Sequence, residues 1–183
     1  MQKFKYAILF SAAVAVSTLA SAADVMVGGQ SMLPSKDIVD NAVNSADHTT
    51  LVAAVKAAGL VDTLKSKGPF TVFAPTNAAF AKLPAGTVES LVKPENKTTL
   101  TKILTYHVVP GKYDFMTLTG EIKKHNGTTE LSTASGGKLF FMMNGPHNIT
   151  VKDESGGVAN ISTYDVYQSN GVINVIDTVL MPK

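Results

Sequence analysis

The hydrophobic positions of this chain change their period about halfway along it. Up to His107, apolar residues recur every three or four positions, as they do on the buried face of a helix. Within this half, Phe70–Ala74 carries apolar residues on both faces, which is typical of a buried strand. Ser35 is the expected cap of the first helix and Gly59 the expected stop of the second. The pattern predicts helices over about 35–43, 49–58, 76–83, 89–92 and 94–107.

From Val108 onward the pattern is that of short strands. Turn residues interrupt this half about every 8–15 residues, close to the spacing of successive antiparallel strands. The most apolar segments, Leu139–Met143 and Val172–Ile176, are expected to be central strands. Because helices come first and strands later, the order predicts an α+β fold rather than a parallel α/β sheet. Turns are expected at Asn126-Gly127, Gly136-Gly137, Asn144-Gly145-Pro146, Ser155-Gly156-Gly157 and Asn170-Gly171.

The first 22 residues have the pattern of a secretory signal peptide. Lys3 and Lys5 precede an almost unbroken apolar run, Ala7–Leu19, and small residues follow it at Ala20–Ala23. The run is shorter than the roughly 20 apolar residues of a membrane span, which disfavours the alternative of a permanent anchor. We therefore expect cleavage within the small-residue segment and export to the periplasm, the cell surface or the medium.

The rest of the chain is expected to contain a short lead-in and one domain. Residues 23–34 are aperiodic and contain glycine, which predicts a flexible or loosely docked lead-in. Residues 35–183 are numerous enough for one domain with a sizeable core. Because no later segment approaches the length of a membrane span, we expect no permanent span after cleavage.

Composition and charge exclude several classes of function. The chain has no cysteine, which rules out thiol catalysis and thiolate metal sites. Its 16 basic residues are all lysine, and removal of Lys3 and Lys5 leaves 14 lysines against 14 acidic residues. Nucleic-acid binding normally requires a basic excess and arginine, so we expect no nucleic-acid partner. A neutral domain is expected to meet its partner through shape and apolar contact before charge.

Three segments together resemble the signatures of the fasciclin domain. Phe70–Phe80 resembles the first signature, Tyr106–Gly111 the central tyrosine–histidine element, and Asn170–Pro182 the closing signature. The resemblance covers residues 35–183. It implies a helical N-terminal half packed on an antiparallel β-wedge or sandwich built mainly from the C-terminal half, in a secreted or surface module for adhesion and protein contact. The signature residues are Phe73, Pro75, Thr76, Asn77, Phe80, Asn170, Gly171 and Asp177.

The central element contains the most chemically versatile side chain of the sequence. His107 lies one helical turn beyond Ile103, on the apolar face, which predicts a buried, neutral ring hydrogen-bonded to backbone or to another side chain. The alternative is a general base or metal ligand, but no partner lies at a useful spacing. Tyr106 points about 100° away around the helix, toward the sheet or a groove. The resemblance links the pair to adhesion, so we expect a structural role first and a contact role second.

A second candidate contact lies just before the closing signature. Some animal fasciclin domains present an Asp-Ile pair there as an integrin contact, and Asp165-Val166 occupies that place here. A contact surface in which the two tyrosines, Tyr164 and Tyr167, flank the acid is one interpretation. The other, which we favour, is a further strand with Tyr164 and Val166 directed inward.

The sequence contains no recognisable catalytic constellation. It lacks a G-x-S-x-G elbow and any H-x-x-x-H or H-E-x-x-H pair. We therefore expect no enzymatic activity, no cofactor and no metal, and a monomer or weak self-association. The expected partner is a cell-surface or matrix protein or glycan. The alternative function is a periplasmic small-ligand carrier or enzyme that uses His107. Glycosylation sequons occur at Asn96, Asn126, Asn148 and Asn160, which we expect to be bare in a bacterial protein.

Overall fold

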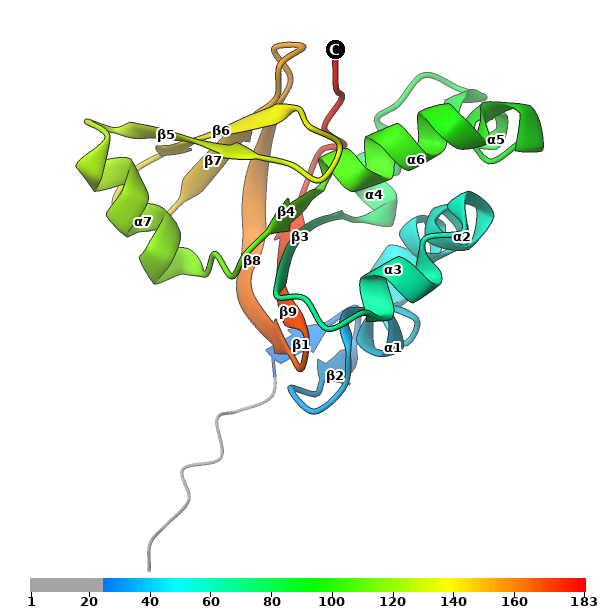
Figure 1. Cartoon of the computed structure of the whole chain (residues 1–183), viewed down its shortest axis with the longest axis horizontal. Coiled ribbons are helices and arrows are strands. Elements are labelled where there is room, and N and C mark those ends of the chain that lie inside the picture. The colour runs from blue at the N-terminus through cyan, green and yellow to red at the C-terminus, as the bar shows by residue number, and fades with distance from the viewer. Residues whose placement is uncertain (1–24) are drawn as a thin grey trace, which may run out of the picture.

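The computed structural model describes residues 25–183. Short helices pack against a curved sheet (Figure 1). Single 3₁₀ turns lie at Ala46–His48 and Pro94–Asn96. The helices are α1 (Ile38–Ala42), α2 (Thr49–Ala58), α3 (Val61–Lys65), α4 (Asn77–Ala81), α5 (Thr87–Leu91), α6 (Lys97–Tyr106) and α7 (Phe115–Lys124). The strands are β1 (Val25–Val27), β2 (Gln30–Met32), β3 (Phe70–Pro75), β4 (Val108–Pro110), β5 (Thr128–Ser132), β6 (Lys138–Met143), β7 (Ile149–Lys152), β8 (Val158–Gln168) and β9 (Gly171–Ile176).

The main sheet has seven strands in the order β4-β3-β9-β8-β7-β6-β5. All neighbours pair antiparallel except β3 and β9, which run parallel from Phe70 opposite Gly171 to Pro75 opposite Ile176. The predicted α+β class is therefore confirmed. Of the two strands expected to be central, β9 lies between β3 and β8, whereas β6 is next to the edge strand β5.

The sheet curls until its two ends nearly meet. Strand β8 is 11 residues long and pairs with β7 through its first part and with β9 through the rest. Register shifts between Ile161 and Val166 mark bulges, which bend a strand and increase its twist. On the opposite side, the amide of Ala134 after β5 donates to the carbonyl of Val108 in β4 across 2.7 Å. The result is a nearly closed barrel.

Two hydrophobic cores lie on the two faces of this sheet. The alternation of side chains along β3 divides them: Val72 and Ala74 belong to the helical core, and Phe73 belongs to the barrel core. The helical core is covered by the helices between α1 and α6, while α7 covers the barrel core with Leu118 and Ile122 (Figure 1). Strand β9 serves both cores and is buried along its whole length.

The structure corrects the expected lead-in. Within residues 23–34, β1 and β2 form an antiparallel hairpin rather than a flexible segment. Val27 and Met32 are buried in the helical core. The side chain of Asn41 in α1 then binds both the amide and the carbonyl of Leu33, at 3.0 and 2.8 Å. The hairpin is stabilised by these tertiary contacts, which its short and glycine-rich sequence does not reveal.

Two local predictions are also wrong. The second half contains a ten-residue helix, α7, where only strands were expected. Threonines and Gly120 lower its intrinsic helix propensity, but Asp114 caps it by accepting a hydrogen bond from the Thr117 amide. The cap of α1 is Asp37 rather than Ser35, since the Asp37 carboxylate accepts from the amide of Asp40.

Other local predictions are confirmed. Gly59 ends α2 in the left-handed conformation, with φ of 73°. Pro75 is the last residue of β3, and the Thr76 hydroxyl caps α4 by accepting from the Ala79 amide. The predicted signal peptide, residues 1–22, lies outside the described residues. Within the described part, no helix is both long and apolar enough to cross a bilayer.

Candidate interaction site

His107 directly follows α6 and is almost completely buried, with 3% of its surface exposed. Its Nδ1 lies 2.8 Å from the Ile103 carbonyl, and its Nε2 accepts from the amide of Leu180 at 3.0 Å. The proton is therefore on Nδ1, and both ring nitrogens are engaged by backbone. Burial lowers the pKa of His107 to about 4, so the ring is neutral at neutral pH. This geometry suits a residue that fastens the C-terminal segment to α6.

Tyr106 is completely buried and faces the barrel core. Its hydroxyl donates to the carbonyl of Lys138 at 2.6 Å and accepts from the amide of Glu154 at 3.0 Å. Burial raises the pKa of Tyr106 to about 12. The side chain therefore connects α6 with β6 and the turn after β7, and it is not on an accessible surface.

Residues of the closing signature hold the helical layer against the sheet. The Asn170 side chain accepts from the amide of Ile38 at 3.0 Å and donates to the carbonyls of Leu64 and Ser66 at 2.7 and 3.0 Å. Next to it, Gly171 is packed against the backbone of β3, where a Cβ atom would lie 2.1 Å from the Phe70 carbonyl oxygen. These two positions therefore require Asn and Gly for different reasons, one for hydrogen bonds and one for space.

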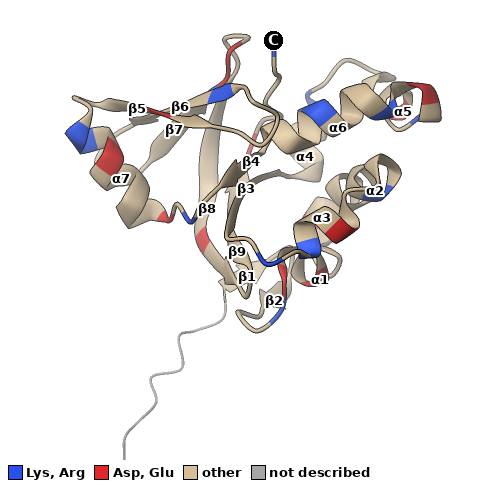
Figure 2. Ribbon diagram, viewed as in Figure 1, with Lys and Arg blue, Asp and Glu red and all other residues tan. Residues whose placement is uncertain are grey.

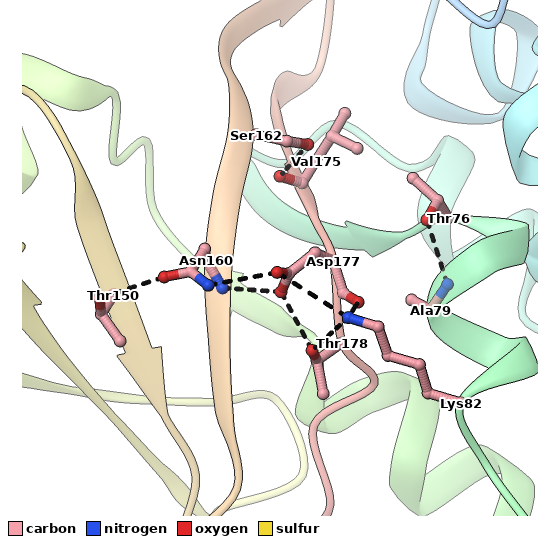
Figure 3. Close-up of polar contacts among 9 residues, drawn as sticks. All are labelled: Thr76, Ala79, Lys82, Thr150, Asn160, Ser162, Val175, Asp177 and Thr178. Atoms are coloured by element: carbon pink, nitrogen blue, oxygen red, sulfur yellow. Dashed lines mark hydrogen bonds and ion pairs between the residues drawn. The ribbon is translucent and has the colours of Figure 1, made fainter.

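Asp177 makes a second fastening point at the end of β9 (Figure 3). Its carboxylate accepts from the Asn160 amide at 2.8 Å and from the Asn160 side chain at 3.2 Å, which joins it to β8. Lys82, just after α4, donates to the Asp177 carbonyl at 2.6 Å. Although partial burial opposes it, hydrogen bonding from the Asn160 amide helps to lower the pKa of Asp177.

The first signature also connects separate elements. Phe73 and Phe80 are buried in the barrel core and the helical core, respectively. The Asn77 side chain accepts from the amide of Thr50 at 3.0 Å and donates to the carbonyl of Ala46 at 2.8 Å. Asn77 therefore caps α2 from a distance of 27 residues along the chain. Sequence reasoning identified this residue only as part of the signature, because a cap from another element leaves no local pattern.

The Asp165-Val166 pair is not presented to solvent as a dipeptide. Val166 is buried in the helical core. Asp165 is half-buried, with φ of 57°, and its carboxylate accepts from the Phe115 amide at 2.7 Å. Burial raises the pKa of Asp165. The Tyr164 ring packs edge-on against Phe115 at 5.1 Å, and its hydroxyl accepts from the amide of Ile149 at 2.7 Å.

An exposed aromatic surface lies beside this pair instead. Tyr167 is 38% exposed, and its hydroxyl donates to the Asp114 carboxylate at 3.3 Å. The Lys112 ammonium lies 4.6 Å from the Tyr167 ring centroid, in a cation–π arrangement. Met116, in the first turn of α7, is 76% exposed. We call these four residues the Tyr167 patch. Of these four residues only Tyr167 was expected from the sequence. Lys112, Asp114 and Met116 were not, although Asp114 followed by Leu118 and Ile122 is a helix-start signal.

Charged groups of both signs are interspersed over the helices and loops (Figure 2). Within residues 25–183, no group of three or more histidine and acidic side chains is placed to hold a metal ion. The Tyr167 patch itself combines one lysine with one acid, Asp114, whose pKa is lowered by its hydrogen bond with the Thr117 hydroxyl. The local surface is therefore balanced in charge and notable for its exposed apolar groups.

The four sequons differ in how their asparagines are engaged. Asn126 and Asn148 are exposed in turns. The Asn96 amide group donates to the Ser90 carbonyl at 2.8 Å, and that of Asn160 donates to Asp177. The side-chain amides of Asn96 and Asn160 are therefore already engaged within the fold.

Comparisons with known proteins agree with this geometry. The family model of the Fasciclin domain matches residues 46–182. The chain is 51% identical over 147 residues to Protein sll1483 of a Synechocystis strain, covering 79% of this chain and 73% of that protein. It is 36% identical over 146 residues to the cell surface glycolipoprotein MPB83 of Mycobacterium bovis, covering 77% and 58%. A solved FAS1 domain pair from the insect cell adhesion molecule Fasciclin I superposes with a TM-score of 0.69 at 19% identity, covering 80% of this chain and 51% of that one.

Proposed function

Because this chain belongs to the fasciclin domain family, we propose that it is an exported, non-enzymatic module that binds a protein or glycan at the cell surface, envelope or matrix. The observation that carries the proposal is the Tyr167 patch, where an aromatic ring and a methionine remain exposed and the ring is contacted by Lys112 and Asp114. A relative of the family, MPB83, is named a cell surface glycolipoprotein, which supports the same location.

The patch has the composition of a contact anchor. Tyrosine combines a large apolar ring with a polar tip and loses little conformational entropy on binding. Here Lys112 and Asp114 already hold the Tyr167 ring before any partner arrives. Met116 can adapt its flexible side chain to an irregular surface. The patch therefore replaces the Asp165-Val166 pair as the contact region, since Val166 is buried.

The enzymatic alternative based on His107 is not favoured by the geometry. A general base or metal ligand needs a ring nitrogen that is available to substrate or metal. Both nitrogens of His107 are engaged by the backbone of Ile103 and Leu180, and the ring is buried. The geometry of His107 therefore fits the non-enzymatic function better than an enzymatic one.

The test compares partner capture by matched surface variants. The chain without residues 1–22 is immobilised, and bound proteins and glycans from envelope extracts of the source cells are identified. We expect Tyr167→Ala and Met116→Ala each to weaken the affinity for the captured partner at least tenfold. Met26→Ala is the matched control, because Met26 is 58% exposed but lies in the β1–β2 hairpin. If the partner binds all four proteins equally, the patch is not its site.

A further inference from the structure

Three Asn-Gly pairs occur in the chain, beginning at Asn126, Asn144 and Asn170. In such a pair the backbone nitrogen of the glycine can attack the side-chain carbonyl carbon of the asparagine, because glycine has no side chain that shields its backbone. The attack requires a glycine amide that is free of a hydrogen bond, an asparagine side chain that can turn, and a backbone that can adjust. The three pairs meet these requirements to different extents.

The pair at Asn170 is fixed by the fold. Asn170 is 7% exposed, and its side chain makes three hydrogen bonds to backbone groups of the helical layer. Gly171 is packed so closely against the backbone of Phe70 that even a Cβ atom would not fit. Neither reacting group can therefore move toward the other unless the helical layer separates from the sheet.

The pair at Asn126 is exposed, but its glycine amide is engaged. Gly127 donates its amide to the carbonyl of Ile122 at 2.8 Å, in the turn that ends α7. Ile122 is itself buried in the barrel core. Before the Gly127 nitrogen can react, this hydrogen bond must break and the end of the helix must open, so the fold slows the reaction at Asn126.

The pair at Asn144 meets all three requirements. Asn144 and Gly145 are exposed in the turn between β6 and β7. The turn is closed by the Asn144 backbone amide, which donates to the carbonyl of Asn148 at 2.7 Å. Within residues 25–183, neither the Asn144 side chain nor the Gly145 amide makes a hydrogen bond, and a Cβ atom on Gly145 would meet no residue beyond its neighbours within 4 Å. The reacting groups are therefore free to approach each other while the strands stay paired.

We propose that Asn144 is a site of spontaneous deamidation and that the fold protects the other two Asn-Gly pairs. The Gly145 nitrogen loses its proton and bonds to Cγ of Asn144, and the side-chain nitrogen leaves as ammonia, which produces a succinimide ring. Water then opens the ring. Attack of water at Cγ gives aspartate, and attack at the backbone carbonyl carbon gives isoaspartate, in which the chain continues through the former side chain. Water is the only co-reactant.

The modification changes both the charge and the backbone of the turn. Without residues 1–22, lysines and acidic residues are equal in number, so one new carboxylate makes the domain acidic. Isoaspartate also adds one atom to the backbone between Met143 and Ile149, which are paired across the turn. The Asn144-Gly145 pair and the Tyr167 patch share no residue, so this inference stands apart from the proposed contact function. Because the reaction needs only time and water, the modified fraction increases with the age of the molecule.

The test follows the three pairs in one sample of the purified protein. The protein is incubated at mildly alkaline pH, and peptide mass spectrometry measures the deamidated fraction at each pair over time. We expect Asn144 to react about tenfold faster than Asn126, the ratio that corresponds to the breaking of one hydrogen bond, and Asn170 to stay intact. In concentrated urea, where the fold no longer protects any pair, we expect the three rates to become similar.

Two matched variants identify the source of the acidic form. Ion-exchange chromatography separates the deamidated protein by its added charge. Asn144→Gln is expected to stop the early appearance of this form, because the longer glutamine side chain cyclises far more slowly. Asn126→Gln, at an equally exposed turn, is expected to leave it unchanged. Equal rates at Asn126 and Asn144 in the folded protein, or an unchanged acidic form in Asn144→Gln, overturn the site. If the ratio of the two rates is the same in urea, the protection by the fold is overturned.

Discussion

The backbone amide of Leu180 donates to Nε2 of His107 across 3.0 Å, and this bond fastens the C-terminal segment to the end of α6. The other ring nitrogen is bonded to the Ile103 carbonyl at 2.8 Å. The imidazole thus acts as a buried bridge between two pieces of backbone. Burial lowers the pKa of this ring, and a proton on Nε2 would in addition break the bond to Leu180.

Replacement of His107 is expected to destabilise the fold. His107→Ala removes both hydrogen bonds and leaves a cavity, so we expect the free energy of unfolding to fall by about 3 kcal/mol. His107→Gln can retain one bond and is expected to lose less. Urea denaturation measures the free energy of unfolding of both variants, with His147→Ala as a control at an exposed position. If His107→Gln remained as stable as the wild type while a catalytic turnover disappeared, the enzymatic interpretation would be correct instead.

Acid is expected to destabilise the protein through the same residue. The pKa of His107 is about 4 in the folded chain, against 6.5 for the ordinary side chain. Its stabilising contribution is fully present above pH 6.5 and is lost as the pH falls toward 4, because the unfolded chain takes up the proton first. Between pH 6.5 and pH 4, the free energy of unfolding is expected to fall by about 3 kcal/mol through this residue.

Carboxylates also titrate near the lower end of this range, so the measurement must isolate the histidine. Urea midpoints of the wild type and of His107→Gln are compared at pH 7, 5.5 and 4.5. The wild type is expected to lose more stability than the variant over this interval. Parallel losses in the two proteins would contradict the assignment to His107.

Asn170→Ala is expected to loosen the helical layer from the sheet. The substitution leaves the Ile38 amide and two carbonyls without their buried partner, so we expect a loss of about 3 kcal/mol. Asn44→Ala, at an exposed site with one hydrogen bond to Asp40, is expected to cost less than 1 kcal/mol. Hydrogen exchange at Ile38 provides the local readout, and unchanged protection there would show that Asn170 is dispensable.

Asp177→Ala is expected to weaken the junction of β8 and β9. It removes the acceptor of the Asn160 amide, at a cost of about 2 kcal/mol, whereas Asp177→Asn keeps one acceptor and is expected to cost less. Chemical denaturation compares both with Glu95→Ala, an exposed acid near the start of α6. Equal stability of the Asp177→Ala and Glu95→Ala variants would mean that the hydrogen bonds of the Asp177 carboxylate, drawn in Figure 3, contribute little.

The β1–β2 hairpin is expected to contribute to stability rather than to behave as a tail. Met32 is 3% exposed in the helical core, so Met32→Ala is expected to cost 2–4 kcal/mol. Met26→Ala, in the same hairpin but 58% exposed, serves as the control and is expected to change little. Thermal and urea unfolding of the two variants should therefore differ clearly, and similar curves would restore the interpretation of a loose lead-in.

The sequence predicted those features that depend on neighbouring residues. The burial of His107 followed from its position one turn after Ile103, and the stop at Gly59 and the cap at Thr76 followed from local chemistry. Helix α7 was missed because its threonines and glycine weaken the local signal, while its stability comes from packing of Leu118 and Ile122 against the barrel core.

Features that depend on distant contacts were beyond local reasoning. Asn77 caps α2 from another element, and the parallel pairing of β3 with β9 joins segments about a hundred residues apart. The contact candidates changed for the same reason. The period-two pattern favoured Tyr164 and Val166 on one inner face, but the bulge at Asp165 sends Val166 into the helical core and Tyr164 against the barrel core. Only the tertiary structure shows that Tyr167 of β8 is linked to Asp114, the cap of α7, and that Met116 in the first turn of that helix is exposed.

The nearly closed sheet limits how copies of this protein can associate. Open strand edges offer unpaired amides and carbonyls on which another chain can add a strand. Here the edge strand β4 has three residues and ends at Pro110, and the Ala134–Val108 hydrogen bond brings the other end of the sheet against it. Within residues 25–183, the main sheet therefore presents little template for polymerisation. Strand addition between copies is therefore disfavoured, and contacts between molecules are left to side chains.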